Sequence, residues 1–170
     1  MDLRAHRETK RRRSWVVTVA VLAALVWGLN HFMISRPIAA ALAADQQTAG
    51  IALTAHLRWY VDPTTLSVDL GGVRTADTTD VFRALVVAAN ALAARSWGVP
   101  PTVALSRGGE PVYTLAGDDL RQHAHDYQFS RRPAAVLAAL VQGLRGPDGK
   151  PLGPETTVES AARRWVAGHP

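Results

Sequence analysis

Cysteine is absent from this chain, and its absence rules out two kinds of chemistry at once. Neither disulfide bonds nor thiol reactions can contribute, so a folded domain must be held together by packing. Residues 50 to 145 provide about 95 positions, enough for one modest hydrophobic core. We therefore expect one small domain and no second independent one.

Charged residues are also missing from Trp15 to Ile34. These 20 residues would form a helix about 30 Å long, which matches the hydrocarbon core of a bilayer. Asn30 and His31, near the far end, would have to reach interfacial water or a partner. The pattern predicts a single transmembrane helix over residues 14–35.

Positive charge is concentrated before that helix. Residues 1–13 contain six basic and two acidic residues, so this arm holds +4 of the formal net charge of +5. The sequence pI of about 10.4 therefore reflects the arm, and we expect no nucleic-acid partner. Because basic flanks stay in the cytoplasm, we predict a single-pass protein of the bacterial inner membrane, with its N-terminus cytoplasmic and its main domain periplasmic.

Two other interpretations of the N-terminal segment stay open. Alanines at positions 39, 41 and 43 are typical of a signal-peptide cleavage region. The pair Arg12-Arg13 is typical of a twin-arginine export signal. The candidate cleavage positions lie about 10 or more residues past the apolar run, farther than a signal peptidase reaches, which favours a retained anchor.

The rest of the chain predicts an α+β domain on a stalk. Residues 36–50 are rich in alanine after a proline and indicate a stalk helix that follows a kink. Residues 51–145 then carry elements in the order β-β-α-β-β-α-α. From Ile51 to Val61 apolar residues alternate with smaller or polar ones, which favours a strand, with a helix as the alternative.

The best-defined element of this domain is a helix. Apolar residues from Val81 to Ala93 follow helical spacing, and Trp97-Gly98 before two prolines ends the helix. Gly108-Gly109 permits the positive φ of a tight hairpin between two β-prone segments. The segments after the first helix are strands over 102–105 and 112–115, a polar helix over 118–127 and an apolar helix from Pro133 to Leu144.

The C-terminal segment, residues 146–170, begins with a stretch rich in proline and glycine that predicts an extended arm. Thr156 and Glu159 have the spacing of a capping box for a short amphipathic helix, with Trp165 and Val166 on its apolar side. A helix of about 10 residues is marginal alone in water, so this face needs a docking surface. Either this domain or another subunit could provide it.

The densest titratable cluster contains Asp119, His123 and Asp126. On a helix, positions i and i+4 share a face, and Asp126 lies one turn farther along. Imidazole and carboxylate groups bind divalent transition ions and also act as bases and acids. The spacing matches no established zinc motif and a further ligand is needed, so a solvated helix face is the simpler interpretation.

Trp27 and His31 form the other candidate site. A neutral imidazole at the edge of a spanning helix can bind haem iron or a chlorophyll magnesium, with Trp27 and Phe32 beside a flat pigment. The alternative is that His31 reaches the headgroups and that Trp27 lies at the interface or contacts a neighbouring helix. No cofactor is otherwise indicated.

Two enzyme classes find no support. Arg107-Gly108-Gly109-Glu110 lacks the lysine and the strand-to-helix context of a phosphate-binding loop. No serine lies in a G-x-S-x-G motif of hydrolases.

The sequence therefore predicts a non-catalytic accessory subunit of a multi-subunit inner-membrane complex. Its partners would be other subunits, contacted through Trp27, Trp165 and Val166, and the lipid bilayer. Photosynthetic and respiratory assemblies are the first to examine, because they commonly contain single-span subunits. The alternatives are a membrane-tethered periplasmic enzyme or metal-binding module, and a scaffold for envelope transport or secretion.

Overall fold

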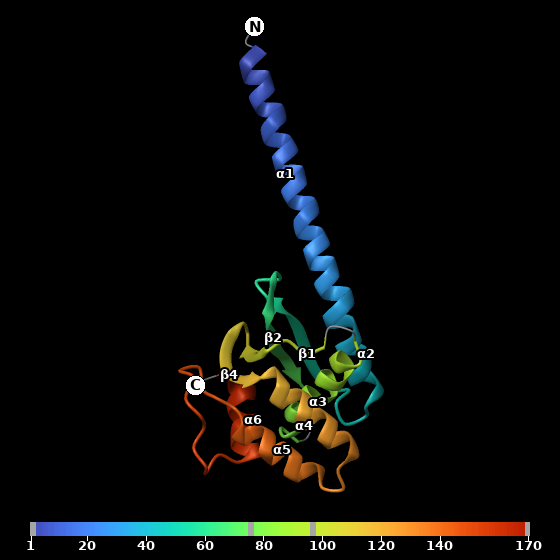
Figure 1. Cartoon of the computed structure of the whole chain (residues 1–170), viewed down its shortest axis with the longest axis vertical. Coiled ribbons are helices and arrows are strands. Elements are labelled where there is room, and N and C mark those ends of the chain that lie inside the picture. The colour runs from blue at the N-terminus through green and yellow to red at the C-terminus, as the bar shows by residue number, and fades with distance from the viewer. Residues whose placement is uncertain (1–2, 75–76, 96–97, 169–170) are drawn as a thin grey trace.

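The computed structural model describes residues 3–74, 77–95 and 98–168, with side chains from Trp15 onward. A long helix rises from a small α+β domain (Figure 1). The backbone of the basic arm is helical from Leu3, whereas its side chains lie outside the described part. The predicted helix end at Trp97 also lies outside it.

The N-terminal helix runs without a break into the domain. α1 (Leu3–Asn30) is followed by a π-helical turn (His31–Ser35) and by α2 (Arg36–Ala44). Pro37 has no N–H to donate, and it follows directly on the π-helical turn, in which the Arg36 amide donates to the His31 carbonyl. Within the described residues, the stretch Trp15–Ala44 is the one helix long and apolar enough to cross a membrane, and a signal sequence has the same character.

The core of the domain is a four-stranded mixed sheet with strand order β1-β2-β3-β4. β1 (Ile51–Arg58) pairs antiparallel with β2 (Asp62–Val73), so the segment from Ile51 is a strand rather than a helix. The strand is shorter than predicted, because residues 59–61 form the turn into β2. β2 pairs parallel with β3 (Thr102–Arg107), and β3 pairs antiparallel with β4 (Glu110–Ala116).

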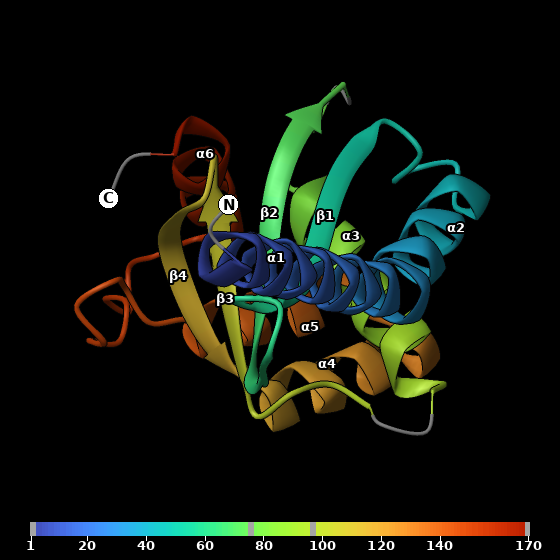
Figure 2. The ribbon, with the colours of Figure 1, turned by 90° about the horizontal axis from the view of Figure 1, so that it is seen from above.

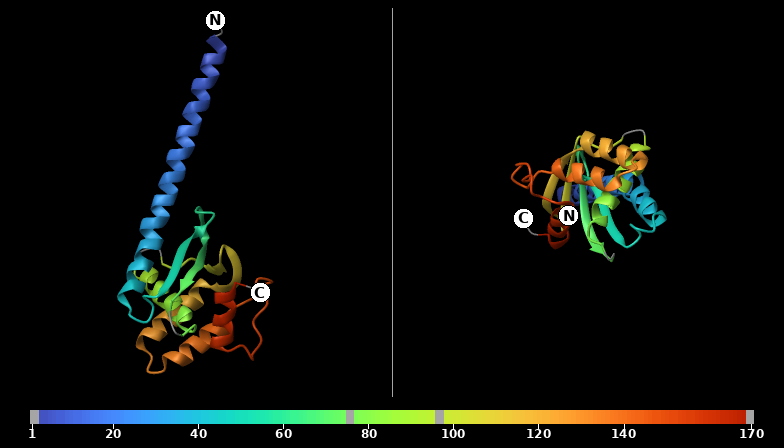
Figure 3. Two further views of the ribbon diagram at one scale, coloured as in Figure 1. Left: turned by 180° about the vertical axis from the view of Figure 1, so that it is seen from behind. Right: turned by 90° about the horizontal axis from the view of Figure 1, so that it is seen from below.

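A parallel pair needs a crossover connection, and α3 (Asp80–Ala93) provides it between β2 and β3. The predicted apolar stripe of this helix is buried, including Phe82 and Leu85. α4 (Gly117–Phe129) and α5 (Pro133–Gln142) continue the layer of helices. In Figure 2 the strands lie in front of α3 and α5, and Figure 3 shows the helices from the opposite side. One face of the sheet is therefore covered, and the other is turned toward the side from which α1 leaves.

The last helix, α6 (Val158–Ala167), docks on its own domain. The Trp165 ring is fully buried, tilted against Phe82 at 5.6 Å between ring centroids, and its Nε1 donates to the Ser106 carbonyl at 2.9 Å. Of the two docking surfaces left open by the sequence, this domain is the one occupied. The capping residue is Thr157, which bonds reciprocally with Ser160, rather than Thr156 with Glu159.

The stretch before α6 is not a free arm. Arg145 exchanges two backbone hydrogen bonds with Thr114 of the edge strand β4, each of 2.9 Å, and Leu152 donates to the Leu144 carbonyl. The segment thus folds back beside β4. It leads the chain to α6, which packs on the covered face of the sheet.

Candidate functional site

Asn30 joins the long helix to the sheet. Its Oδ1 accepts a hydrogen bond from the Leu57 amide at 2.9 Å, and its Nδ2 donates to the Tyr60 carbonyl at 2.9 Å and to the Val26 carbonyl at 3.1 Å. The residue is only 5% exposed. The polar group expected to find interfacial water or a partner instead has its partners within the chain.

Ser35 makes a second contact of the same kind. Its hydroxyl donates to the Ala55 carbonyl at 2.8 Å. β1 is an edge strand, and unpaired edge groups would otherwise be open to another chain. Asn30 and Ser35 therefore satisfy two backbone groups of β1, the Leu57 amide and the Ala55 carbonyl.

Farther along, α2 is fixed to the domain by apolar and ionic contacts. Ile34, Ile38 and Leu42 are buried in the core. The Arg83 guanidinium of α3 lies 3.1 Å from the Asp45 carboxylate at the end of α2. Together with the continuous helix, these contacts make the connection between anchor and domain a packed junction and not a flexible linker.

The connection between β1 and β2 is a tight turn next to this junction. The Val61 amide donates to the Arg58 carbonyl at 3.3 Å, and the two central residues, Trp59 and Tyr60, have φ values of 54° and 61°. Both lie in the left-handed region, which bulky side chains rarely adopt. Trp59 is 76% exposed and Val61 67% exposed.

The uncovered side of the sheet, called here the outer face, carries small and polar side chains. It forms a hollow of about 420 Å³ between the β1–β2 turn and Pro147 of the segment beside β4. The small residues of this face are Thr65, Ser67, Thr102, Ala104, Ser106 and Thr114, and the larger His56, Arg58 and Trp59 line the hollow at the β1–β2 hairpin.

Two titratable groups belong to the same side of the sheet. His56 stacks on Tyr60 with 4.8 Å between ring centroids. Burial lowers the pKa of His56, and the Asp69 carboxylate opposes that shift. Oδ1 of Asp69 is buried and has no hydrogen-bond partner among the described atoms. A hydrogen-bond donor brought to this oxygen would remove an unfavourable state.

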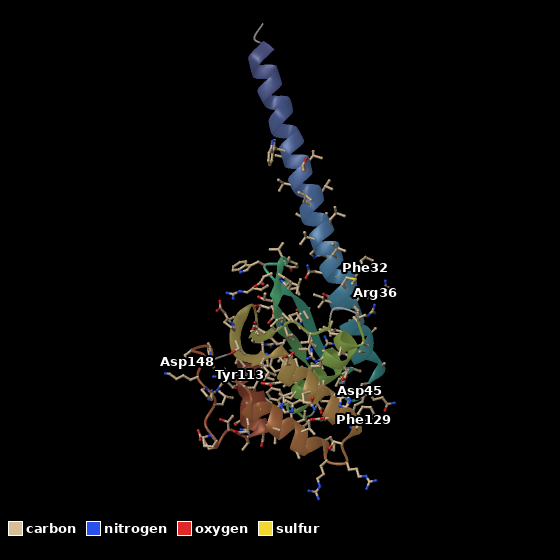
Figure 4. The ribbon with its side chains drawn as sticks, viewed as in Figure 1. Phe32, Arg36, Asp45, Tyr113, Phe129 and Asp148 are labelled. Atoms are coloured by element: carbon tan, nitrogen blue, oxygen red, sulfur yellow. The ribbon has the colours of Figure 1, made fainter. Side chains whose placement is uncertain are left out.

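His31 and His56 line one further hollow, of about 510 Å³, between the helix and β1. His31 stacks on Trp27 with 5.5 Å between centroids and 9° between ring planes, and it meets Phe32 edge-on. Arg36 lies one turn beyond Phe32 on the helix (Figure 4), with its guanidinium carbon over the Phe32 ring at 5.6 Å from the centroid. The arrangement offers an exposed aromatic surface, and pigment or haem binding by His31 stays a prediction.

The cluster on α4 is dispersed. Asp119 is exposed, while Asp126 accepts a hydrogen bond from Gln122 at 2.9 Å. The distance from Nδ1 of His125 to Asp126 is 3.7 Å. No group of three or more His, Cys, Asp or Glu side chains suited to a metal ion occurs within the described residues. Asp119, His123 and Asp126 are therefore part of a polar helix surface here.

The three residues assigned to partner contact differ in position. Trp27 is exposed on α1, as that role requires. Val166 is half-buried and packs against the core. Trp165 is fully buried in its own domain, so its indole is not available to a partner in this structure.

Sequence reasoning missed the junction itself. Asn30 and Ser35 were separated from Leu57 and Ala55 by 27 and 20 positions, respectively, and nothing in local spacing pairs them. The only available signal was a polar amide at the end of an apolar run, which demands a partner.

Comparison with known proteins finds no relative. No family model matches the chain, no curated protein matches it, and no solved structure matches its fold.

Proposed function

We propose that this protein is a non-catalytic accessory subunit of a multi-subunit inner-membrane complex. In this proposal α1 spans the bilayer with the basic arm in the cytoplasm, and the domain lies in the periplasm. The outer face of the sheet contacts a neighbouring subunit, and Trp27 contacts a neighbouring helix or lipid.

The packed junction between anchor and domain is the observation that carries the proposal. A tethered enzyme that searches for substrate works well on a flexible linker. Here a continuous helix, the buried Asn30 and the Asp45–Arg83 ion pair leave the domain little freedom to rotate. Such a junction suits a subunit that presents one surface in one orientation.

The outer face supports the same proposal. Its small side chains let another chain approach closely, and its hollow is open to the surroundings. Helices cover the other face of the sheet, so the outer face is the larger uncommitted surface of the domain.

Energy-transducing assemblies are the first class to test, because they contain single-span subunits and would give the His31–Trp27 surface a partner. A transport or secretion scaffold is the second, since it has the same topology. The tethered enzyme or metal module, built on Asp119, His123 and Asp126, is the competing hypothesis.

The test is mild-detergent extraction from native membranes, followed by size separation, mass spectrometry and an absorption spectrum. The outer-face variant Thr65→Arg/Thr102→Arg places two bulky cations on neighbouring strands, since these residues are register partners. Gln128→Arg, an exposed change on α4, is the matched control. The proposal expects the wild type and the control to migrate in a large complex, and the outer-face variant to migrate alone.

A wild-type chain that migrates alone would contradict the accessory role. The enzyme hypothesis makes a different prediction. If it is right, His123→Ala/Asp126→Ala should abolish an activity or a bound metal of the membrane fraction. If that variant keeps both the complex and its metal content, the enzyme hypothesis is wrong.

A further inference from the structure

The tip of the β1–β2 hairpin is the most exposed apolar part of the domain that lies near the anchor. Trp59 and Val61 project from it, and the Tyr60 ring stacks on His56. In Figure 1 the tip points to the side from which α1 leaves the domain.

The tip lies against the C-terminal end of α1. The Asn30–Tyr60 hydrogen bond joins the two directly. Between them is an apolar hollow of about 390 Å³, bounded by α1 on one side and the hairpin on the other. Its residues are Val26, Leu29, Asn30 and Met33 from the helix and Leu57, Tyr60 and Val61 from the hairpin. A bilayer that surrounds Val26 and Leu29 would therefore reach Val61 as well.

The length of free helix points in the same direction. Asn30 and Ile34 are buried in the domain, so the apolar helix is free on all sides only from Trp15 to Leu29, and beyond it one side that carries Phe32 and Met33 stays exposed. These 15 residues span about 22 Å, less than the roughly 30 Å hydrocarbon core. Thinning of the bilayer, or arginines that reach the headgroups, can compensate part of this difference in length. An apolar hairpin tip that enters the interface would compensate the remainder.

The backbone conformation of the turn does not explain why aromatic residues occupy it. Trp59 and Tyr60 hold left-handed φ values that glycine or asparagine would adopt with less strain. Tryptophan and tyrosine are the residues that favour the membrane interface. The two central positions thus carry residues that suit a bilayer and do not suit the turn.

We infer that residues 59–61 insert into the headgroup–acyl boundary of the leaflet facing the domain, as a second membrane contact beside α1. The inference depends on the membrane anchoring in the proposed function, but not on the partner complex. Two contacts define an orientation, whereas one helix leaves the domain free to tilt. The hairpin and Asn30 together would hold the outer face of the sheet at a set angle to the membrane.

Single-cysteine labelling tests the insertion, because the chain has no cysteine of its own. Val61→Cys places one fluorophore at the tip. Phe129→Cys is the matched control, since Phe129 is 73% exposed and lies at the end of α4, away from α1 (Figure 4). Leu22→Cys reports on the middle of the apolar helix. Each full-length variant is reconstituted in phosphatidylcholine–phosphatidylglycerol vesicles with or without a nitroxide on the upper acyl chain.

An interfacial group lies roughly 5–10 Å into the headgroup–acyl boundary, so we expect the nitroxide lipid to quench the Val61 probe by about twofold and to leave the Phe129 probe unchanged. Equal quenching at Val61 and Phe129 would overturn the inference. So would a Val61 probe that is shielded from aqueous iodide but not quenched by the lipid, because a second copy of the chain would then cover the tip.

The Leu22 probe separates this inference from the anchor. Quenching at Leu22 without quenching at Val61 would leave the anchor intact and remove only the hairpin contact. Absence of quenching at both positions would contradict the membrane anchoring itself. The double variant Trp59→Ser/Val61→Ser, with unchanged near-ultraviolet circular dichroism of the remaining core, should reduce the tilt constraint measured by polarised infrared spectroscopy in oriented bilayers.

Discussion

The two hairpins of the sheet both have turns with left-handed φ values, but one turn uses glycines and the other uses aromatic residues. The β3–β4 turn uses Gly108 and Gly109, at φ values of 61° and 84°, and lies between polar Arg107 and Glu110. The β1–β2 turn adopts left-handed φ values at Trp59 and Tyr60 instead. The first turn follows backbone preference, and the second departs from it. Backbone preference therefore explains the residues of the β3–β4 turn but not those of the β1–β2 turn.

The hairpins are also supported from different parts of the chain. The Trp165 indole of α6 bonds to Ser106 beside the β3–β4 turn. The Asn30 amide of α1 bonds to Leu57 and Tyr60 at the β1–β2 turn. One hairpin is therefore held by the C-terminal helix within the core, and the other by the long N-terminal helix α1.

Removing the Trp165 support should have the largest effect. Trp165→Ala deletes a fully buried indole and should lower the free energy of unfolding by about 3–5 kcal/mol. Trp165→Phe keeps much of the volume but leaves the Ser106 carbonyl without its donor, and should cost about 1–3 kcal/mol. Denaturant titration of the detergent-solubilised chain measures both. A change within about 0.5 kcal/mol for Trp165→Ala, as at a surface position, would mean that α6 is not docked.

Removing the Asn30 support should have an intermediate effect. Asn30→Ala leaves the Leu57 amide without its side-chain partner, and we expect a loss of about 1–3 kcal/mol. It should also weaken lipid quenching of a probe at Val61, because the tip is no longer held against α1. The matched control is Asn90→Ala, which removes one hydrogen bond from a side-chain amide to the Ala124 carbonyl within the domain. If both variants alter the Val61 probe equally, the junction is not what positions the hairpin.

Exchanging the residues of the β1–β2 turn tests why they differ from those of the β3–β4 turn. Trp59→Asn/Tyr60→Gly places preferred residues at two left-handed positions and should stabilise the domain in detergent by about 1 kcal/mol after loss of the His56–Tyr60 stacking. The same variant should lose the membrane contact of the tip. The converse change, Gly108→Ala, should destabilise by about 1 kcal/mol. A destabilised Asn-Gly variant would show that the aromatic residues serve folding.

The smallest effect concerns pH at the β1–β2 hairpin. Burial lowers the pKa of His56 below 6.5, with Asp69 acting against it, so the unfolded chain binds a proton more readily than the folded one. Stability should therefore fall as the pH drops through and below 6.5. His56→Gln should flatten this part of the dependence of the melting temperature on pH.

Local pattern predicted most of the secondary structure and little of the site. The helical stripe around Phe82 and Leu85, the alternation from Ile51 and the paired glycines all became the expected elements. Each depends on residues close together in sequence. The order of strands, the parallel β2–β3 pair and the docking of Trp165 depend on residues far apart, which periodicity does not relate.

The α4 cluster shows what shared spacing leaves open. Asp119, His123 and Asp126 were grouped because helical geometry places such positions near one face. Ligation needs side chains that converge on a point, usually from more than one element. In the structure the surrounding elements bring no further acidic or imidazole group to them within the described residues.

Hydropathy, charge and local periodicity are properties of neighbouring residues, so they predict an uncharged apolar helix behind a basic arm and an α+β domain in the order β-β-α-β-β-α-α. The hydrogen bond of Asn30 to the edge of β1 and the position of the β1–β2 turn beside α1 follow from the fold and not from local pattern. Those contacts join residues 27 and 30 positions apart. They arise from the way helix and sheet pack in space, since a buried amide must find its hydrogen-bond partners wherever the fold brings them.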